Sequence, residues 1–242
     1  MNDVLRALGS ALRGVLHPRM LALAIWPMLV ALALWLGLAW LYWESWSQWI
    51  HTLVAGSSVS DWLPQRGLEQ LVRASALVLL SLLLAPMILL TAVLIAAVLE
   101  MPLILRFVAS RDYPSLEKRQ GGTALGGIVN ALVAVLVFAG LWVVTLPLWF
   151  TGVLAPVVPV VLTAYLNQRL FRYDALADHA SADEYRAILA TSRGRMYVLG
   201  VLLALLYYVP LVNLLVPVLS GIAFAHFCLA RLAELRAQGG ER

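Results

Sequence analysis

The sequence contains few charged residues and almost no cysteine. Only 12% of its 242 residues are charged, and Cys228 is the single cysteine. One thiol cannot close a disulfide within the chain or build a thiolate metal cage. Hydrophobic residues make up 62% of the chain, whereas soluble domains are about half apolar. The composition therefore predicts a membrane protein.

Motifs of catalysis and cofactor binding are also missing. The four histidines are scattered, with no carboxylate or second histidine at metal-ligand spacing on one face. Neither a phosphate-binding glycine loop nor a G-x-S-x-G elbow occurs. We therefore expect a protein that is not an enzyme and that binds no metal or cofactor. His226 is the one ionisable residue expected at membrane depth, either as a functional group or, more commonly, as a neutral imidazole bonded to a neighbouring helix.

Long runs without charged side chains define the predicted membrane segments. Four runs exceed the roughly 20 residues that cross a bilayer as a helix, namely 20–43, 74–99, 121–168 and 196–230. The first is too long for the apolar core of a signal peptide, so we expect it to remain as a membrane helix. The sequence thus predicts an all-α polytopic protein that forms a single integral membrane domain over residues 1–242.

The first two runs allow more complete crossings than the last two. Runs 20–43 and 74–99 each fit one long transmembrane helix. In 121–168, a long helix near 124–150 leaves only a shorter one that begins at Pro156 and Pro159. Two arms within 196–230 would have about 15 residues each, or roughly 22 Å, against a hydrocarbon core of about 30 Å. We expect two long helices plus shorter, partly penetrating hairpins; for the last hairpin, a tight turn at the outer surface is the alternative.

The turn of the last hairpin is marked by Pro210, Asn213 and Pro217. Proline ends the first arm because it lacks an N–H, and Asn213 is suited to cap the start of the second arm. Pro217 then falls in the first turn, where a missing donor costs little. Helix starts at this depth offer free N–H groups to an anion, which makes Asn213 a candidate for substrate binding.

The basic residues predict how the chain is oriented. Of 17 basic residues, only two, Arg66 and Arg73, lie in or beside the segment between the first two runs. The positive-inside rule then places both termini and the loops 106–123 and 169–195 in the cytoplasm, and residues 44–70 in the periplasm. Because such charges report orientation, the net charge of +4 does not predict nucleic-acid binding.

Residues 1–19 predict an amphipathic N-terminal helix. Arg6 and Arg13 lie together on the face opposite a stripe of valine and leucine residues. Such a helix lies either at the lipid interface or on the protein's own surface, and the pattern supports both equally.

A second arginine face is expected on the helix that follows the S-x-x-E capping box at 181–184. Arg186 and Arg193 are seven residues apart and share one side of this helix. Two neighbouring guanidiniums can bind an oxyanion, although a solvated face that sets topology is the commoner use of such a pair.

Together, these segments resemble the CysZ-type sulfate permeases, which are grouped with the etoposide-induced-protein-like membrane domain. The resemblance includes the segment RYDALADHASADEYRAILATSRG. It is also carried by a first helix bounded by Pro18 and Pro27 and by Pro102 after the second helix. A P-x-x-N-x-x-x-P signature completes it, with Pro210, Asn213, Pro217 and Gly221. It implies an oligomeric protein of the bacterial inner membrane that takes up sulfate for cysteine synthesis.

The chain departs from this family in one place. The sulfate permeases tend to carry arginines three and four residues after the first proline, where this chain has Leu21 and Ala22. Arg19 is the only arginine nearby, and with Asn213, Arg186 and Arg193 it completes the predicted substrate-binding set. The sequence favours a homo-oligomeric permease for sulfate or a similar small oxyanion; the alternative is a membrane scaffold of the same fold without transport activity.

Overall fold

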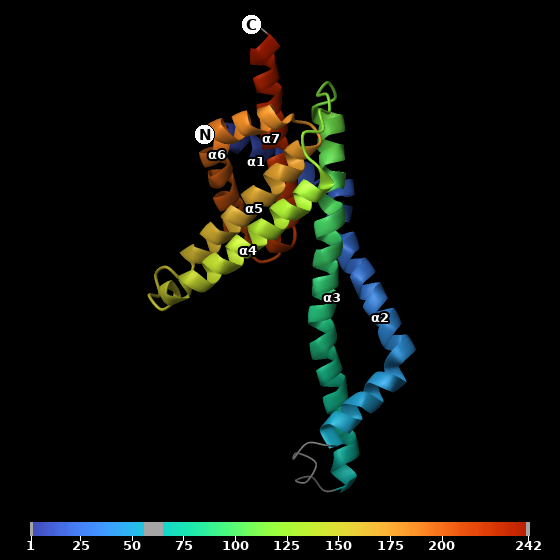
Figure 1. Ribbon diagram of the computed structural model, residues 1–242. Coiled ribbons are helices and arrows are strands. Elements are labelled where there is room, and N and C mark those ends of the chain that lie inside the picture. The colour runs from blue at the N-terminus through green and yellow to red at the C-terminus, as the bar shows by residue number, and fades with distance from the viewer. Residues whose placement is uncertain (1, 56–64, 241–242) are drawn as a thin grey trace. The chain divides into compact units, whose positions relative to one another are not determined.

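The computed structural model describes residues 2–55 and 65–240, and the regular elements within these ranges are all helical (Figure 1). Part of the predicted periplasmic segment, 56–64, lies outside the described residues. The prediction of an all-α protein is confirmed. The helices are α1 (Asn2–Val15), α2 (Pro18–Ala55), α3 (Gln65–Asp112), α4 (Ala124–Trp149), α5 (Val157–Ala177), α6 (Ala182–Leu205), the short 3₁₀ turns η2 (Leu206–Tyr208) and η3 (Val212–Leu214), and α7 (Val216–Gly240).

The chain forms two compact units. Residues 25–97 form one, which holds most of α2 and the first part of α3. In this unit the indole Nε1 of Trp35 donates a hydrogen bond to Thr91 Oγ1 at 2.9 Å, which joins α2 to α3. The other unit contains α1, the start of α2, the end of α3 and all of α4 to α7. All the charged clusters described below lie in this second unit.

Several helices can cross a membrane. By length and composition, four segments of the described chain do so: Pro18–Trp49, Leu125–Trp149, Ala182–Tyr208 and Val216–Gly239. The prediction of a multi-pass membrane protein is therefore confirmed. The finer prediction of two long transmembrane helices with shorter hairpins is not confirmed by this set, because both arms of the last hairpin belong to it.

The arms of the last hairpin are longer than the sequence predicted. The expected length of about 15 residues counted only the charge-free run between the helix ends. Helices α6 and α7 have 24 and 25 residues, because both extend into charged sequence. Segment 169–195 is accordingly not a loop, since only 178–181 separate α5 from α6, and in 106–123 the chain stays helical as far as Asp112.

Prolines mark the start of the second helix in both hairpins. Pro156 directly precedes α5, Pro159 lies in its first turn, and Pro217 is the second residue of α7. A proline at these positions loses no intrahelical hydrogen bond. Val209, which precedes Pro210, is extended with φ −90° and ψ 112°, as the clash with the following ring requires.

Asn213 does not cap α7 as the sequence predicted. It lies inside η3, and α7 begins only at Val216. The carbonyl of Leu215 accepts the N–H of Leu219 at 2.8 Å and so opens the helix. The prediction was wrong because the chain makes an extra 3₁₀ turn after Pro210, and a 3₁₀ turn leaves little trace in sequence.

Helix α1 lies against α7 through a narrow stripe of small side chains (Figure 1). Its buried residues recur at spacings of three and four, at Val4, Ala7, Ala11 and Val15. Leu5 and Leu12 of α1 are exposed, and so is Leu16, which directly follows the helix. The helix thus packs on the protein's own surface, which is one of the two placements considered from the sequence, while placement at the lipid interface stays a prediction.

Two close helix contacts are made at glycines. One joins α6 to α5, and the other joins α7 to the end of α3. A Cβ on Gly200 of α6 would lie 2.9 Å from the carbonyl oxygen of Ala164 in α5. A Cβ on Gly221 of α7 would lie 2.9 Å from Ile104 in α3. Small residues at such contacts let membrane helices pack backbone to backbone. The result is a tight group of helices that positions the charged ends of α6 and α7.

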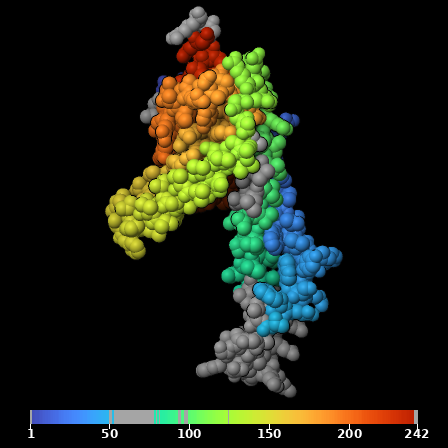
Figure 2. Space-filling model, in the orientation of Figure 1, coloured from blue at the N-terminus to red at the C-terminus, as the bar shows by residue number. Residues whose placement is uncertain are grey.

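Helix α4 is far less enclosed. Among its described side chains only Ala134 is buried, and Figure 2 shows α4 at the surface beside α5. Its link to α5 is partly polar: Asn130 Nδ2 donates to the carbonyl of Arg169 at 3.1 Å, and Arg169 Nε donates to Asn130 Oδ1 at 3.3 Å.

Candidate anion-binding site

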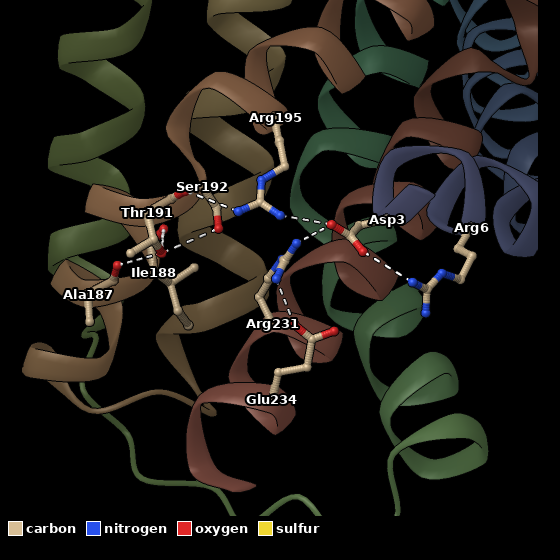
Figure 3. A network of polar contacts seen from close by, with 9 residues as sticks. All are labelled: Asp3, Arg6, Ala187, Ile188, Thr191, Ser192, Arg195, Arg231 and Glu234. Carbon is tan, nitrogen blue, oxygen red and sulfur yellow. Dashed lines mark hydrogen bonds and ion pairs between the residues drawn. The ribbon is translucent and has the colours of Figure 1, made fainter. Parts of the chain in front are cut away.

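Three arginines converge on one aspartate near the start of α1 (Figure 3). Arg195 Nη1 of α6 donates to Asp3 Oδ2 at 2.8 Å, and Arg231 Nη2 of α7 donates to the same oxygen. Arg6 Nη2 reaches Asp3 Oδ1 at 3.4 Å, and Arg231 Nη1 donates to Glu234 Oε2 at 2.7 Å. We call these five residues the Asp3 cluster.

The fold brings this cluster together in a simple way. Arg195 directly precedes the charge-free run 196–230, and Arg231 directly follows it. Because α6 and α7 are the two arms of one hairpin, the ends of that run lie at the same level. Helix α1 packs on α7 and adds Asp3 from its first turn, where the helix dipole favours a negative charge.

The Asp3 cluster is partly buried and carries an excess of positive charge. The side chains of Arg231 and Asp3 are 18% and 23% exposed, so their attraction is screened less than that of a surface pair. Three guanidiniums face two carboxylates, which leaves one positive charge in excess. Within the described chain the Nε of Arg231 is buried without a hydrogen-bond partner. The cluster therefore has donor capacity beyond what Asp3 and Glu234 accept.

A cavity of 180 Å³ adjoins the cluster and is lined by Asp3, Arg6, Arg231 and Glu234, with Ser10, Tyr113 and His226 among the other residues. The hydroxyl of Tyr113 donates to the carbonyl of His226 at 3.2 Å. That contact uses the one proton of the hydroxyl, so the charged donors left for an anion are the guanidiniums of Arg6 and Arg231, and guanidinium is the group that binds oxyanions best. The cavity is thus suited to a small oxyanion.

His226 lies at the edge of this cavity and also of a neighbouring cavity of 310 Å³. Its Nε2 is 3.7 Å from Asp112 Oδ2, and its ring is tilted against Tyr113 with centroids 6.0 Å apart. The imidazole therefore packs against the end of α3, but among the described residues no hydrogen bond joins its ring to that helix, so the bonded arrangement expected from the sequence is not shown.

A second charged cluster is built around Glu184 and has a different character. The predicted capping box is confirmed: Glu184 N donates to Ser181 Oγ at 3.2 Å, and Ser181 N donates to Glu184 Oε2 at 2.8 Å. The same carboxylate accepts from Arg119 at 2.8 Å and from Arg236 Nε at 2.9 Å. Backbone and arginines together use the acceptor positions of Glu184, so we assign this cluster a structural role that ties the end of α7 to the start of α6.

The substrate-binding residues predicted from the sequence do not come together. Arg186 forms an exposed pair with Asp183 at 3.5 Å, and Arg193 is exposed on α6. Arg19 is exposed at the start of α2, and Asn213 is exposed in η3, beyond the other end of α6. None of the four predicted residues belongs to the Asp3 cluster or lines its cavity.

Sequence reasoning treated Arg195 and Arg231 only as charges that set topology. A signal was nevertheless present, because these two arginines bound the charge-free run on either side and a hairpin must bring them close. The contribution of Asp3 had no comparable signal, since it depends on where α1 docks.

Comparison with known families agrees with the resemblance read from the sequence. The family model described as sulfate transporter CysZ/etoposide-induced protein 2.4 matches residues 7–217. The chain belongs to this family. No match was found among curated proteins or among solved structures. Within the Asp3 cluster, Arg195 lies inside the match to the CysZ family, whereas Asp3, Arg6 and Arg231 lie outside it.

Proposed function

We propose that this protein is a permease of the bacterial inner membrane for sulfate or a similar small oxyanion. The observation that carries the proposal is the match of residues 7–217 to a family named for a sulfate transporter. A multi-pass helical fold is consistent with transport. The Asp3 cluster holds three guanidiniums, two of which, Arg6 and Arg231, line the 180 Å³ cavity, and this chemistry is suited to such a substrate.

The Asp3 cluster is the site at which we expect the oxyanion to bind. A charge-assisted hydrogen bond from a guanidinium contributes about 1.5–3 kcal/mol, and several are needed to compensate an anion for its lost hydration. Arg195 and Arg231 meet at one point, whereas Arg186 and Arg193 are exposed to solvent. The convergence of the first pair favours it over the second.

The proposed orientation has both termini and the segments 106–123 and 169–195 in the cytoplasm, with 44–70 in the periplasm. It is supported by the distribution of basic residues. An impermeant thiol reagent added to intact cells should label the Gln48→Cys variant and leave Asp183→Cys unlabelled. The opposite labelling pattern would refute this topology.

The last hairpin crosses the membrane only in part in this proposal. The first 14 residues of α6 carry five charged side chains, Asp183, Glu184, Arg186, Arg193 and Arg195. The charge-free part that follows in α6 and η2, 196–208, reaches only about 20 Å of the roughly 30 Å core. We further propose a homo-oligomer, as the resemblance to the CysZ-type permeases implies.

Uptake of labelled sulfate into a strain that lacks its own sulfate transport tests the proposal. Wild-type protein should restore uptake and growth on sulfate. Arg195→Gln should abolish uptake if the Asp3 cluster is the site, while Arg193→Gln should retain it. The reverse result would return the site to the exposed face of α6. No uptake by well-expressed wild-type protein would refute the permease and favour the scaffold alternative.

A further inference from the structure

We infer that Asp3 is an internal ligand of an oxyanion site formed by Arg195 and Arg231, and that a small oxyanion such as sulfate displaces it. The inference rests on the proposed function and deepens it, because it names the group that competes with the substrate. It also makes the first turn of α1 the part of the protein that responds when the anion binds.

The contacts of Asp3 are those of a shared ligand. Arg195 Nη1 and Arg231 Nη2 come from different helices and donate to one oxygen, Oδ2 (Figure 3). An oxyanion that places an oxygen at this position would bind both guanidiniums at once. Asp3 reaches the position from a third helix, so its removal breaks no contact between the two arms of the hairpin.

Asp3 leaves much of the donor capacity of these arginines unused. Each gives Asp3 a single N–H, although a guanidinium carries five. Arg195 Nη2 turns to the carbonyl of Thr191 at 3.3 Å, and the buried Nε of Arg231 has no partner among the described residues. A tetrahedral anion presents four oxygens where a carboxylate presents two, so it can accept more of these donors.

The charges around the site match a dianion. Without the carboxylate of Asp3, the cluster keeps the positive charges of Arg6, Arg195 and Arg231 and the negative charge of Glu234. The surplus is then two positive charges, which sulfate would neutralise. With Asp3 in place the cluster keeps one surplus positive charge, and Arg6, whose side chain is 76% exposed, is the best solvated of its three arginines.

Asp3 differs from Glu184, which among the described residues is the other carboxylate held by two or more arginines. Glu184 also accepts a backbone N–H in its capping box and is fixed by it. Within the described chain, the hydrogen bonds to the Asp3 carboxylate come from arginine side chains alone. The 180 Å³ cavity reaches Asp3 directly, which gives an incoming anion space beside the carboxylate that it replaces.

Calorimetric titration of the purified full-length protein with sodium sulfate, at constant ionic strength, tests the competition. Asp3→Asn keeps the shape of the side chain and removes its charge, so sulfate should bind at least about tenfold more tightly than to wild type. Adding Arg195→Gln to that variant should remove the gain. The matched control is Asp183→Asn, because Asp183 is also a carboxylate paired with an arginine but is 92% exposed, and its affinity should equal that of wild type.

Hydrogen exchange of the first turn of α1 gives a second readout. Sulfate should speed amide exchange in residues 6–9 of wild type, whose N–H groups bond to the carbonyls of the first turn of α1, because it releases Asp3 from the arginines. In Asp3→Asn the exchange should already be fast and should not respond to sulfate. A purely structural role for Asp3 predicts no effect of sulfate on exchange in either protein.

The outcomes separate this inference from the proposed function. Equal sulfate affinities of wild type and Asp3→Asn, or the absence of sulfate binding from every variant, would overturn the inference. If wild-type cells still took up sulfate in that case, the permease function would stand. Tighter binding by Asp3→Asn without uptake by wild type would instead support the site and refute the permease.

Discussion

Helices α4 and α7 have nearly the same length, and both can cross a membrane, yet the protein uses them in opposite ways. In the most apolar part of α7, 78% of residues are buried inside the protein, against 6% in α4. Helix α4 is nonetheless the more apolar of the two. Of these two membrane helices, the more apolar one is therefore the one left open to lipid. Burial inside the protein depends instead on close packing and polar contacts between helices.

The two helices also differ in how they are attached. Helix α7 packs against α1, α5 and α6 and ends in arginines of both charged clusters, Arg231 and Arg236. Helix α4 contains no ionisable residue and is held to α5, where Asn130 bonds with Arg169. The comparison assigns structural cohesion and the candidate site to α7, and lipid contact to α4.

The largest expected effect separates the core from the lipid-facing surface. Phe224→Ala in α7 should lower the free energy of unfolding by about 3–5 kcal/mol, because it empties a site that is 0% exposed. Leu136→Ala in α4, where the side chain is 62% exposed, should cost less than about 0.5 kcal/mol. Thermal unfolding in detergent, followed by circular dichroism, measures both. Similar losses in the two variants would end the distinction between α4 and α7.

A smaller effect is expected from glycines in packed and open helices. Gly200→Ala places a Cβ 2.9 Å from the carbonyl oxygen of Ala164, so α5 and α6 must separate, at a cost of about 1–3 kcal/mol. Gly140→Ala in α4 meets no atom within 4 Å and should stabilise the helix by roughly 0.5–1 kcal/mol. The same unfolding measurement should show shifts of opposite sign. Stabilisation by Gly200→Ala would contradict the close contact.

The smallest effect is a pH dependence of stability that comes from His179, which lies between α5 and α6 and contacts Arg236 of α7. Burial, and after it the charge of Lys118, lower the pKa of His179 below its ordinary value of 6.5; Asp178 opposes this and Arg236 adds to it. Between the two pKa values the unfolded chain binds the proton and the folded protein does not, so stability is full above about pH 6.5 and falls as pH drops below it. One proton limits the slope to about 1.4 kcal/mol per pH unit.

Unfolding midpoints measured between pH 8 and pH 5 test this dependence. His179→Gln should flatten the profile in that range, while variants in α4 should keep the wild-type profile because α4 has no titrating group. An unchanged profile in His179→Gln would show that another group is responsible.

Local features of the fold could be predicted from the sequence. The helix near 124–150 is α4, Pro156 marks the start of α5, and the S-x-x-E box opens α6, because apolar length, missing N–H groups and caps act within a few residues. The errors arose where local signals were weak. Helices α6 and α7 continue through charged sequence, and the 3₁₀ turn around Asn213 moved the start of α7.

The candidate site shows the limit of the sequence. The family, the helical membrane fold and a supply of arginines could be read from residue types and spacing, since hydropathy and short motifs are properties of contiguous sequence. Which arginines meet could not, because Asp3 is 192 residues from Arg195 and 228 from Arg231. Their contact depends on the packing of α1 on α7 and on the hairpin that aligns the ends of α6 and α7. Contacts between such distant residues exist only after the helices have docked, and that step the tertiary structure alone decided.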